Sequence, residues 1–313
     1  MNELDFIEAL RAIATDPAAR GLADDAAVLG DLVLTHDSIA EGVHFLPHDP
    51  PASVGWKLVA VNLSDLAAKG AEPLAALMSV TIAGDGTWEE AFLAGVAAAC
   101  EAYKLPLVGG DTIALPAAAP RVLGLTAIGR GGAEVPSRAG GQAGDRLWLV
   151  GTLGDAAAGL AALQADRKAE GLLVEAYRRP VPLLAAGRAL APRAHAMMDV
   201  SDGLLLDLSR LCAASACGAR LDLDALPLSR AFIAERGQHR PARLFAATGG
   251  DDYALLAALA PDLDPLSLCL PQGAQLSPIG SLTDGGGISL FDAAGEVPLP
   301  ERLGYEHHRD STA

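Results

Sequence analysis

Cysteine is scarce in this chain, and the spacing of the few that occur excludes the common thiol-based sites. The 313 residues include four cysteines, and the only close pair, Cys212 and Cys217, lies five positions apart on one predicted helix. Zinc sites and redox motifs of the CxxC type need a closer pair. We therefore expect reduced thiols that mostly pack inside the protein.

Basic residues are also few. The chain has 23 lysines and arginines against 39 aspartates and glutamates, which gives a formal net charge of −16. Proteins bind a phosphate backbone through clustered Lys and Arg, so we expect no nucleic-acid partner. An excess of carboxylates most often serves solubility alone, and it becomes informative only where the acids gather beside glycines.

Long hydrophobic runs are missing as well. No apolar run approaches the roughly 18 residues needed to span a bilayer. The first residues, MNELDFIEAL, lack the basic start and the apolar core of a signal peptide. We expect a cytoplasmic protein without a membrane partner.

The composition favours an α/β protein of two domains. A chain of 313 residues is long for one core, and domains commonly have about 150 residues. Half of the residues (51%) are hydrophobic, many of them alanine, and aromatic residues are few, which suits Ala-rich helices on sheets better than an all-β sandwich. A glycine-rich stretch at 129–145 interrupts the pattern, and we place the domains at 1–137 and 138–313.

Helical and strand periodicities alternate in both halves. Helices are predicted at 53–70, 88–104, within 155–192, at 202–217 and within 228–248. Strands are predicted at 31–36, 76–83, 105–110, 122–130, 146–151, 195–200, 219–224, 252–259 and within 275–291. No repeat of fixed period occurs.

Aspartates recur beside glycines and at the edges of predicted strands. They are Asp24, Asp25, Asp37, Asp65, Asp111, Asp199, Asp202, Asp251 and Asp252. Such loops are held by a rigid sheet, and glycine lets the backbone approach phosphate oxygens. Oxygen ligands without a His or Cys cluster suit Mg²⁺, which usually arrives with nucleotide phosphates. No P-loop or credible dinucleotide motif is present, so metal ions would have to bridge the carboxylates to any nucleotide.

Two helical patterns each leave a structural and a functional interpretation open. Asn62, Asp65 and Lys69 form a polar stripe on the helix at 53–70, and the simpler interpretation is a solvated face. Ser201 precedes a predicted helix and can act as its N-cap, either to close the helix or to leave its N-terminus facing an anion.

The adjacent carboxylates Asp251 and Asp252 raise a similar choice. Their repulsion is relieved by a metal ion, by a cationic substrate or by exposure to water. The residues alone leave these three alternatives open.

Ten segments in register resemble the thiamine-monophosphate kinase family, over essentially the whole chain. They are DDAAV, THDSIAEGVHF, VNLSDLAAKGAEP, GGDT, SRAGGQAGD, VGTLGD, RRPVP, MDVSDGLLLDL, GGDDYALL and GYEHH. The superfamily also contains aminoimidazole ribonucleotide synthetase and selenophosphate synthetase. The resemblance implies ATP-dependent phosphorylation of thiamine monophosphate to thiamine diphosphate. It also implies a two-domain α/β fold and a homodimer in which the N-terminal sheets of two subunits pair.

The resemblance also implies roles for individual positions. The Mg²⁺ positions are Asp25, Thr35, His36, Asp37, Asp65, Asp111, Asp199 and Asp202. The ATP positions are Gly110, Asp111, Arg138 and Ser201, and the thiamine-phosphate positions are His44, Asp251 and Tyr305. Asp37, Asp202 and Arg138 are expected to act directly in the transfer. Asp251 is expected to face the cationic substrate while local backbone amides hold Asp252, and a solvated turn is the alternative. The acceptor is an ionised phosphate oxygen, so no general base is named.

Several of these residues also have a plain structural interpretation. Arg138 is otherwise a surface arginine, His44 a structural histidine, and Tyr305 an anchor for the C-terminus. Three positions depart from the family pattern. Ala23 replaces a glycine, His36 replaces a threonine, and Asp251 replaces a glutamate. His36 is harmless if its backbone carbonyl makes the metal contact.

Two other functions remain open at this stage. One is a sister ATP-dependent enzyme of the same fold that acts on another small substrate. The other is a non-catalytic nucleotide-binding relative. An early reactive cysteine and a cysteine at the C-terminus, typical of sister enzymes, are both missing.

Overall fold

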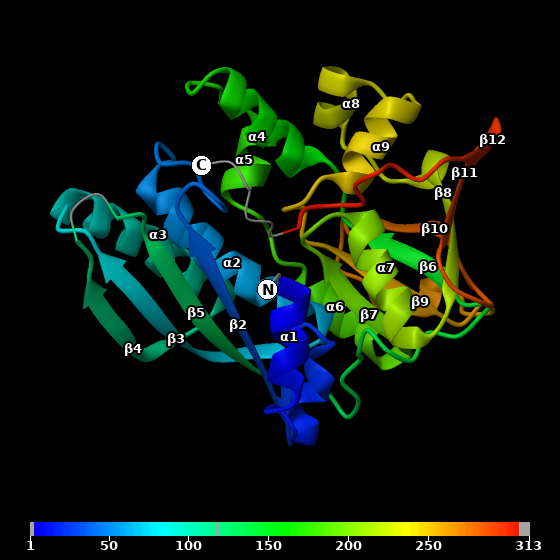
Figure 1. Cartoon of the computed structure of the whole chain (residues 1–313), viewed down its shortest axis with the longest axis horizontal. Helices are drawn as coiled ribbons and strands as arrows, with labels where there is room; N and C mark the ends of the chain where they lie inside the picture. Colours follow the sequence, from blue (N-terminus) through cyan, green and yellow to red (C-terminus); the bar gives the residue numbers. More distant parts are fainter. Residues whose placement is uncertain (1–2, 117–118, 307–313) are drawn as a thin grey trace.

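Two β-sheets and the helices that cover them make up the protein (Figure 1). The computed structural model describes residues 3–116 and 119–306. The last two residues of the GYEHH segment, His307 and His308, lie outside the described residues.

The first sheet has five strands in the order β1-β2-β5-β3-β4. They are β1 (Ala27–Leu29), β2 (Leu32–Ala40), β3 (Glu72–Ile82), β4 (Leu107–Ala114) and β5 (Val122–Arg130). Neighbouring strands are antiparallel except β3 and β4, which are parallel. Parallel strands need a crossover, and helix α3 (Gly86–Tyr103) provides it.

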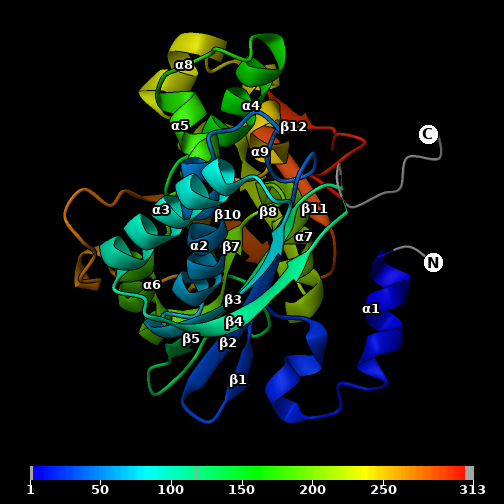
Figure 2. The same ribbon diagram turned by 90° about the vertical axis from the view of Figure 1, so that its left-hand side faces the viewer.

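Helix α2 (Pro51–Ala68) lies at the centre of the molecule, and 14 of its 18 residues are buried. It contacts β2 and β5 of the first sheet and also strands of the second sheet. The main hydrophobic core therefore contains Leu66 of α2 together with Trp148 and Leu255 of the C-terminal half. Figure 2 shows α2 and α3 on one side of the first sheet and α1 (Glu3–Arg11) on the other.

The second sheet has seven strands in the order β12-β11-β8-β10-β6-β9-β7. They are β6 (Arg146–Val150), β7 (Ala194–Val200), β8 (Gly218–Asp222), β9 (Ala254–Leu259), β10 (Leu276–Thr283), β11 (Ile288–Asp292) and β12 (Gly295–Val297). All six residues of β9 are buried, as expected for a strand covered on both faces.

Six further helices cover the second sheet or extend above it. They are α4 (Asp155–Ala165), α5 (Leu172–Arg178), α6 (Leu184–Leu190), α7 (Leu204–Ser215), α8 (Arg230–Arg236) and α9 (Arg240–Thr248). Short 3-10 turns lie at Pro17–Leu22, Ala191–Arg193, Leu223–Ala225 and Pro265–Ser267.

The predicted alternation of strands and helices matches the structure closely, with three differences that matter for the site. Strand β2 continues to Ala40, and β4 continues to Ala114, so Asp37 and Asp111 lie within strands and not at their ends. Helix α7 begins at Leu204, later than predicted. No prediction covered α1 or the turn that follows it.

The domain division at 137/138 stays a prediction. The first sheet ends with β5 at Arg130 and the second begins with β6 at Arg146, and this boundary lies in the connecting segment. The core around α2 nevertheless crosses it. Among the described residues, no helix is long and apolar enough to cross a membrane.

Glycines allow α2 and α3 to touch. A methyl group added at Gly95 would lie 1.9 Å from the carbonyl oxygen of Ala52, and one added at Gly55 would lie 2.2 Å from that of Phe92. These distances are far below van der Waals contact, so the two backbones can approach only because both side chains are missing.

We expect Gly95→Ala to lower the free energy of unfolding by about 1–3 kcal/mol, because overpacking outweighs the gain of about 1 kcal/mol in helix propensity. Gly86→Ala, in the same helix, is the control because a methyl group there meets open space. Urea unfolding of both variants measures the difference. A Gly95→Ala protein as stable as Gly86→Ala would contradict the close crossing.

Candidate functional site

Three carboxylates from distant parts of the chain meet beside α2. Asp65 lies on α2, Asp199 near the end of β7, and Asp25 in the turn before β1, and their oxygens lie within 4.8 Å of one another. Hydroxyl groups fix two of them. Thr35 donates a hydrogen bond to Asp65, and Ser64 Oγ donates to Asp199 Oδ2 over 2.6 Å. The predicted metal positions Asp25, Thr35, Asp65 and Asp199 are therefore brought together.

Burial disfavours the charged forms of Asp65, Asp199 and the neighbouring Asp37. Burial and then the neighbouring Asp25 carboxylate raise the pKa of Asp199 to about 8. Burial and then Asp37 raise the pKa of Asp65 well above its usual value, and burial raises the pKa of Asp37. A divalent cation removes this penalty because it offsets several negative charges at once. The donor set, which consists of hard oxygen atoms, fits Mg²⁺.

Three basic side chains bind Asp24 and Asp25 at one corner of the cluster, and Arg20 contacts Asp24 alone. The Lys69 ammonium lies 2.5 Å from Asp24 Oδ1 and 2.6 Å from Asp25 Oδ2, and Arg138 Nε donates to Asp25 Oδ1 over 2.6 Å. Burial opposes the charge on Asp24, but Lys69 and Arg20 outweigh it and lower the pKa of Asp24. Positive charge therefore reaches Asp24 and Asp25, and Asp65 and Asp199 depend on hydroxyl donors.

The interpretation of Asn62, Asp65 and Lys69 as a solvated face is wrong. All three side chains are buried, because α2 is covered on several sides and not on one. Asn62 Oδ1 accepts a hydrogen bond from the backbone N–H of Asp37 over 2.9 Å. These three side chains therefore face the inside of the site, and the Asn62 hydrogen bond joins α2 to β2.

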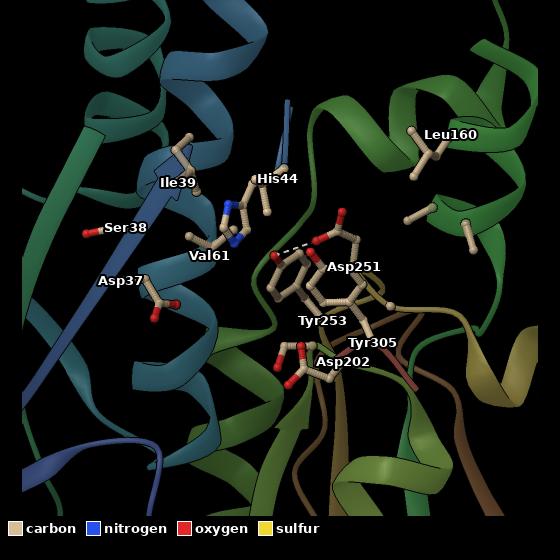
Figure 3. A pocket seen from close by; sticks show the side chains of 15 residues that line it. Asp37, Ser38, Ile39, His44, Val61, Leu160, Asp202, Asp251, Tyr253 and Tyr305 are labelled. Atoms are coloured by element: carbon tan, nitrogen blue, oxygen red, sulfur yellow. Dashed lines mark hydrogen bonds between the residues drawn. The ribbon is translucent and has the colours of Figure 1, made fainter. Parts of the chain in front are cut away.

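A pocket with a volume of about 360 Å³ opens beside the cluster (Figure 3). Asp37 of β2 lies on one wall, and Asp202, Asp251 and Tyr305 lie on the facing wall. Apolar side chains that include Ile39, Val61 and Leu160 also line it, together with His44 and Ser201. Carboxylates and an apolar lining therefore share one cavity.

Ser201 does not cap α7, contrary to the sequence prediction. The helix begins three residues later, and Asp207 of its first turn accepts the backbone N–H groups of Asp202 and Gly203. Arg210 Nη1 lies 2.5 Å from Asp202 Oδ2 and 2.9 Å from Asp207 Oδ1. Asp207 therefore holds the loop just before the helix, and Ser201 lines the pocket.

Asp251 and Asp252 face different partners, which explains how the chain accommodates adjacent like charges. Asp251 Oδ2 lies 2.8 Å from the Lys57 ammonium, and Asp252 Oδ2 accepts the backbone N–H of Gly154 over 2.6 Å. The solvated-turn alternative does not describe this loop. The backbone amides that hold Asp252 come from the start of α4, which is distant in sequence and not local.

The other two predicted substrate residues also line the pocket. His44 Nδ1 accepts the backbone N–H of Ala40 over 3.1 Å, which fixes its ring in the loop after β2. The backbone N–H of Tyr305 donates to the Asp202 carbonyl over 2.8 Å. This bond ties the C-terminal segment to the loop that carries Asp202, and about half of Tyr305 (47%) remains exposed.

Gly110 and Asp111 are not brought to the pocket within one chain. Asp111 on β4 pairs with Ser79 on β3, Ser79 pairs with Gly124 on β5, and Gly124 pairs with Ser38 on β2. Three strand spacings, about 14 Å, therefore separate Asp111 from β2. All eight residues of β4 are exposed.

The His36 side chain points away from the carboxylate cluster. Successive strand residues face opposite sides of a sheet, so His36 lies on the face opposite to Asp37. Its Nδ1 is 2.8 Å from Thr126 Oγ1 on that face. A metal contact by its imidazole does not fit this position, and a contact by its backbone carbonyl stays a prediction.

Sequence reasoning missed Lys57, Asp207 and Arg210. Each lies in a helix whose apolar residues dominate, so its charge indicates only a solvated position. For Asp207 a signal existed, because an acid in the first turn of MDVSDGLLLDL is a capping candidate. Burial, and then Asp202, raise the pKa of Asp207 to about 7.

Removing one buried carboxylate should stabilise the metal-free protein at alkaline pH. The pKa of Asp199 rises from 3.8 in the unfolded chain to about 8 on folding, so its contribution to stability falls as the pH rises through that window. At pH 8.5 with EDTA, we expect Asp199→Asn to raise the melting temperature by about 2–8 °C, with a smaller gain at pH 5.

The exposed Asp284→Asn change is the control. Adding Mg²⁺ should reverse the order, because the wild type gains a ligand that the variant has lost. Differential scanning fluorimetry measures both effects. An Asp199→Asn protein that melts below the wild type in EDTA at pH 8.5 contradicts the predicted charge penalty.

Comparison with known proteins identifies the family. The model of the AIR synthase related protein, N-terminal domain, matches residues 23–131, and that of the C-terminal domain matches residues 142–293. Thiamine-monophosphate kinase of Caulobacter vibrioides is 37% identical over 307 residues, which covers 93% of this chain and 86% of the relative. The Escherichia coli enzyme is 36% identical and covers 92% and 91%.

Solved structures agree. A structure described as "AaThiL complexed with AMPPCP and TMP" superposes with a TM-score of 0.84 at 29% identity, over 98% of this chain and 97% of that one. Thiamine-monophosphate kinase from Stenotrophomonas maltophilia gives a TM-score of 0.76 at 36% identity, over 91% and 94%. The hydrogenase maturation protein HypE of E. coli, at 22% identity, shares the fold. The expected two-domain α/β fold is confirmed, and the chain belongs to the thiamine-monophosphate kinase family.

Proposed function

We propose that this chain transfers the γ-phosphoryl group of ATP to thiamine monophosphate and so forms thiamine diphosphate. The observation that carries the proposal is one pocket in which carboxylates suited to Mg²⁺ adjoin an apolar wall with His44, Asp251 and Tyr305. Thiamine monophosphate has a phosphate at one end and an aminopyrimidine at the other, with a cationic thiazolium ring between them, so it has groups that suit both parts of the pocket. The names of the relatives, and the ligands in the name of AaThiL, support the same reaction.

The carboxylates are the proposed metal ligands. Asp25, Asp65 and Asp199 form the buried group, and Asp37 and Asp202 face the pocket from opposite walls. Bound Mg²⁺ would neutralise the phosphate oxygens of ATP and of the acceptor. The protein's own part is to hold these carboxylates in fixed positions through Thr35, Ser64 and Arg210.

Arg138 and Ser201 are the proposed contacts to the ATP phosphates. Burial opposes the charge of Arg138, but its contact with Asp25 raises the pKa above the usual arginine value, so the guanidinium stays charged. Its fork of donors suits phosphate oxygens. Transfer to an ionised phosphate needs positioning and charge neutralisation more than proton removal, so we assign no general base.

We also propose a homodimer that completes the site. Strand β1 pairs only with Leu32–Leu34 of β2, and in the described residues no strand pairs with the outer edge of 35–40. No strand in the described part of the chain pairs with the outer edge of β4 either, and its Leu107, Val108 and Ile113 are exposed. Pairing of β4 with β2 of a second copy would bring Asp111 of the partner subunit beside Asp37. Open edges of this kind favour such pairing.

A cytoplasmic location is proposed as well. The four cysteines, all within the described part of the chain, are free thiols, as expected in a reducing compartment. Both substrates are small charged molecules.

The activity test uses purified protein with MgATP and thiamine monophosphate, and measures ADP and thiamine diphosphate. We expect Asp37→Asn and Asp202→Asn each to lower kcat about 100-fold or more, because each change removes charge where the phosphates meet. Asp284→Asn is the control and should match the wild type.

Circular dichroism verifies that each variant is folded. If either variant keeps the wild-type kcat, the residue changed in it has no role in the proposed site. A wild-type protein that binds MgATP without turnover favours the non-catalytic alternative. ATP turnover with a different acceptor favours a sister enzyme.

The dimer proposal predicts complementation between inactive variants. Asp37→Asn and Asp111→Asn subunits, co-expressed with different tags, should recover about a quarter of the wild-type activity, because half of the dimers are mixed and each mixed dimer has one intact site. If Asp111 acted within its own chain, the mixture would stay inactive.

Mass measurement provides the second arm of that test. The wild type should have twice the chain mass of 31.9 kDa, and Ile113→Glu on β4 should give a single chain mass. Leu266→Glu is the control because Leu266 is exposed in a turn away from β4. A wild type with one chain mass contradicts the homodimer.

A further inference from the structure

Lys57 is a buried cation that has no assigned role in the proposed reaction. Only 2% of its side chain is exposed, although α2 places it next to the pocket. The Lys57 ammonium lies 2.8 Å from Asp251 Oδ2 and donates to the carbonyl of His44 over 2.9 Å. It also lies 4.0 Å from the centre of the Tyr177 ring on α5. One ammonium group therefore joins α2 to three separate segments, and two of these carry proposed substrate residues.

Lys57 holds the Asp251 carboxylate from the side that faces away from the pocket. The second oxygen, Oδ1, accepts a hydrogen bond from the Tyr253 hydroxyl over 2.9 Å, so each carboxylate oxygen has one internal donor. Burial, and then Asp251 itself, raise the pKa of Tyr253, which keeps the phenol a donor. A carboxylate oxygen accepts two hydrogen bonds, and the Asp251 side chain is 26% exposed in the pocket. One acceptor position on each oxygen thus remains for a ligand.

The same contacts change what Asp251 offers to a ligand. The Lys57 ammonium offsets its charge at 2.8 Å, so this wall presents a fixed hydrogen-bond acceptor more than a free negative charge. A fixed acceptor selects a ligand that carries an N–H donor, and it rejects an analogue without one because the acceptor would be left unpaired. Thiamine monophosphate carries such a donor in the amino group of its pyrimidine ring.

We propose that Lys57 is a positioning residue that sets substrate specificity: it holds Asp251 and the His44 loop so that the pocket recognises the amino group of the aminopyrimidine. This inference rests on the proposed function. Lys57 acts through Asp251 and His44 and does not line the pocket itself. The cationic ring of the substrate then need not lie against Asp251.

The test is steady-state kinetics of Lys57→Met with both substrates. We expect the KM for thiamine monophosphate to rise roughly 10- to 100-fold, because a hydrogen bond to a charged group is lost or misplaced. The KM for ATP should stay within about 2-fold of the wild-type value, because the carboxylate cluster is untouched. The preference for thiamine monophosphate over its analogue with oxygen in place of the pyrimidine amine should fall by a similar factor.

Arg121→Met is the matched control. Arg121 also contacts a carboxylate, Glu41, and lies 4.0 Å from the ring centre of Trp88, but it does not line the pocket. Its loss should alter the melting temperature without changing either KM. In an Asp251→Asn background, Lys57→Met should add little to the KM for thiamine monophosphate, because the group through which it acts is already altered.

Several results would overturn the inference. They are an unchanged KM for thiamine monophosphate in folded Lys57→Met, an equal rise in both KM values, and unchanged discrimination against the analogue. If Lys57→Met does not fold, Lys57→Arg keeps the charge and moves it, and the same rise in one KM alone is expected. If the wild type phosphorylates thiamine monophosphate and the Lys57 variants keep the wild-type KM values, only the role of Lys57 is contradicted. If the wild type neither binds nor phosphorylates thiamine monophosphate, the proposed function is contradicted as well.

Discussion

Burial of several carboxylates in one small volume is the constraint on which the site depends. Asp65 and Asp199 lose water on folding, and within residues 3–116 and 119–306 their hydrogen-bond donors are hydroxyl groups, so their charged forms are disfavoured. Asp25 is instead held by Lys69 and Arg138. Under the proposed function a bound cation offsets this penalty, because its charge balances several carboxylates at once. The fold around the cluster keeps the carboxylates from separating.

Helix α2 imposes that geometry because it carries charged and polar groups along its whole buried length. Ser64 and Asp65 belong to the carboxylate cluster, and Lys69 near the C-terminal end holds Asp24 and Asp25. Lys57, two turns before the cluster, holds Asp251 on the far wall of the pocket. The proposed phosphate and thiamine ends of the pocket are thus fixed by one rigid element, whose close contact with α3 requires glycine on both helices.

Sequence patterns predicted the elements well because their periodicity reflects burial directly. The largely apolar run of β5 and the apolar face of α3 are visible without any structure. The same reasoning failed for α2, whose polar stripe lies inside the protein and not in water. It also failed at Ser201, because the local motif does not reveal that Asp207 binds the amides of Asp202 and Gly203 just before α7. Both errors concern groups whose partners lie in other elements or further along the same helix.

The sequence by itself determined the α/β class, the order of the elements and the candidate carboxylates, because composition, periodicity and glycine-flanked aspartates are local properties. The family resemblance supplied the roles assigned to those positions. Only the tertiary structure decided that Asp25, Asp65 and Asp199 converge, that Asp111 lies about 14 Å from β2, and that Lys57 reaches Asp251. These relations join residues that are up to 194 positions apart, and only folding brings such residues close together.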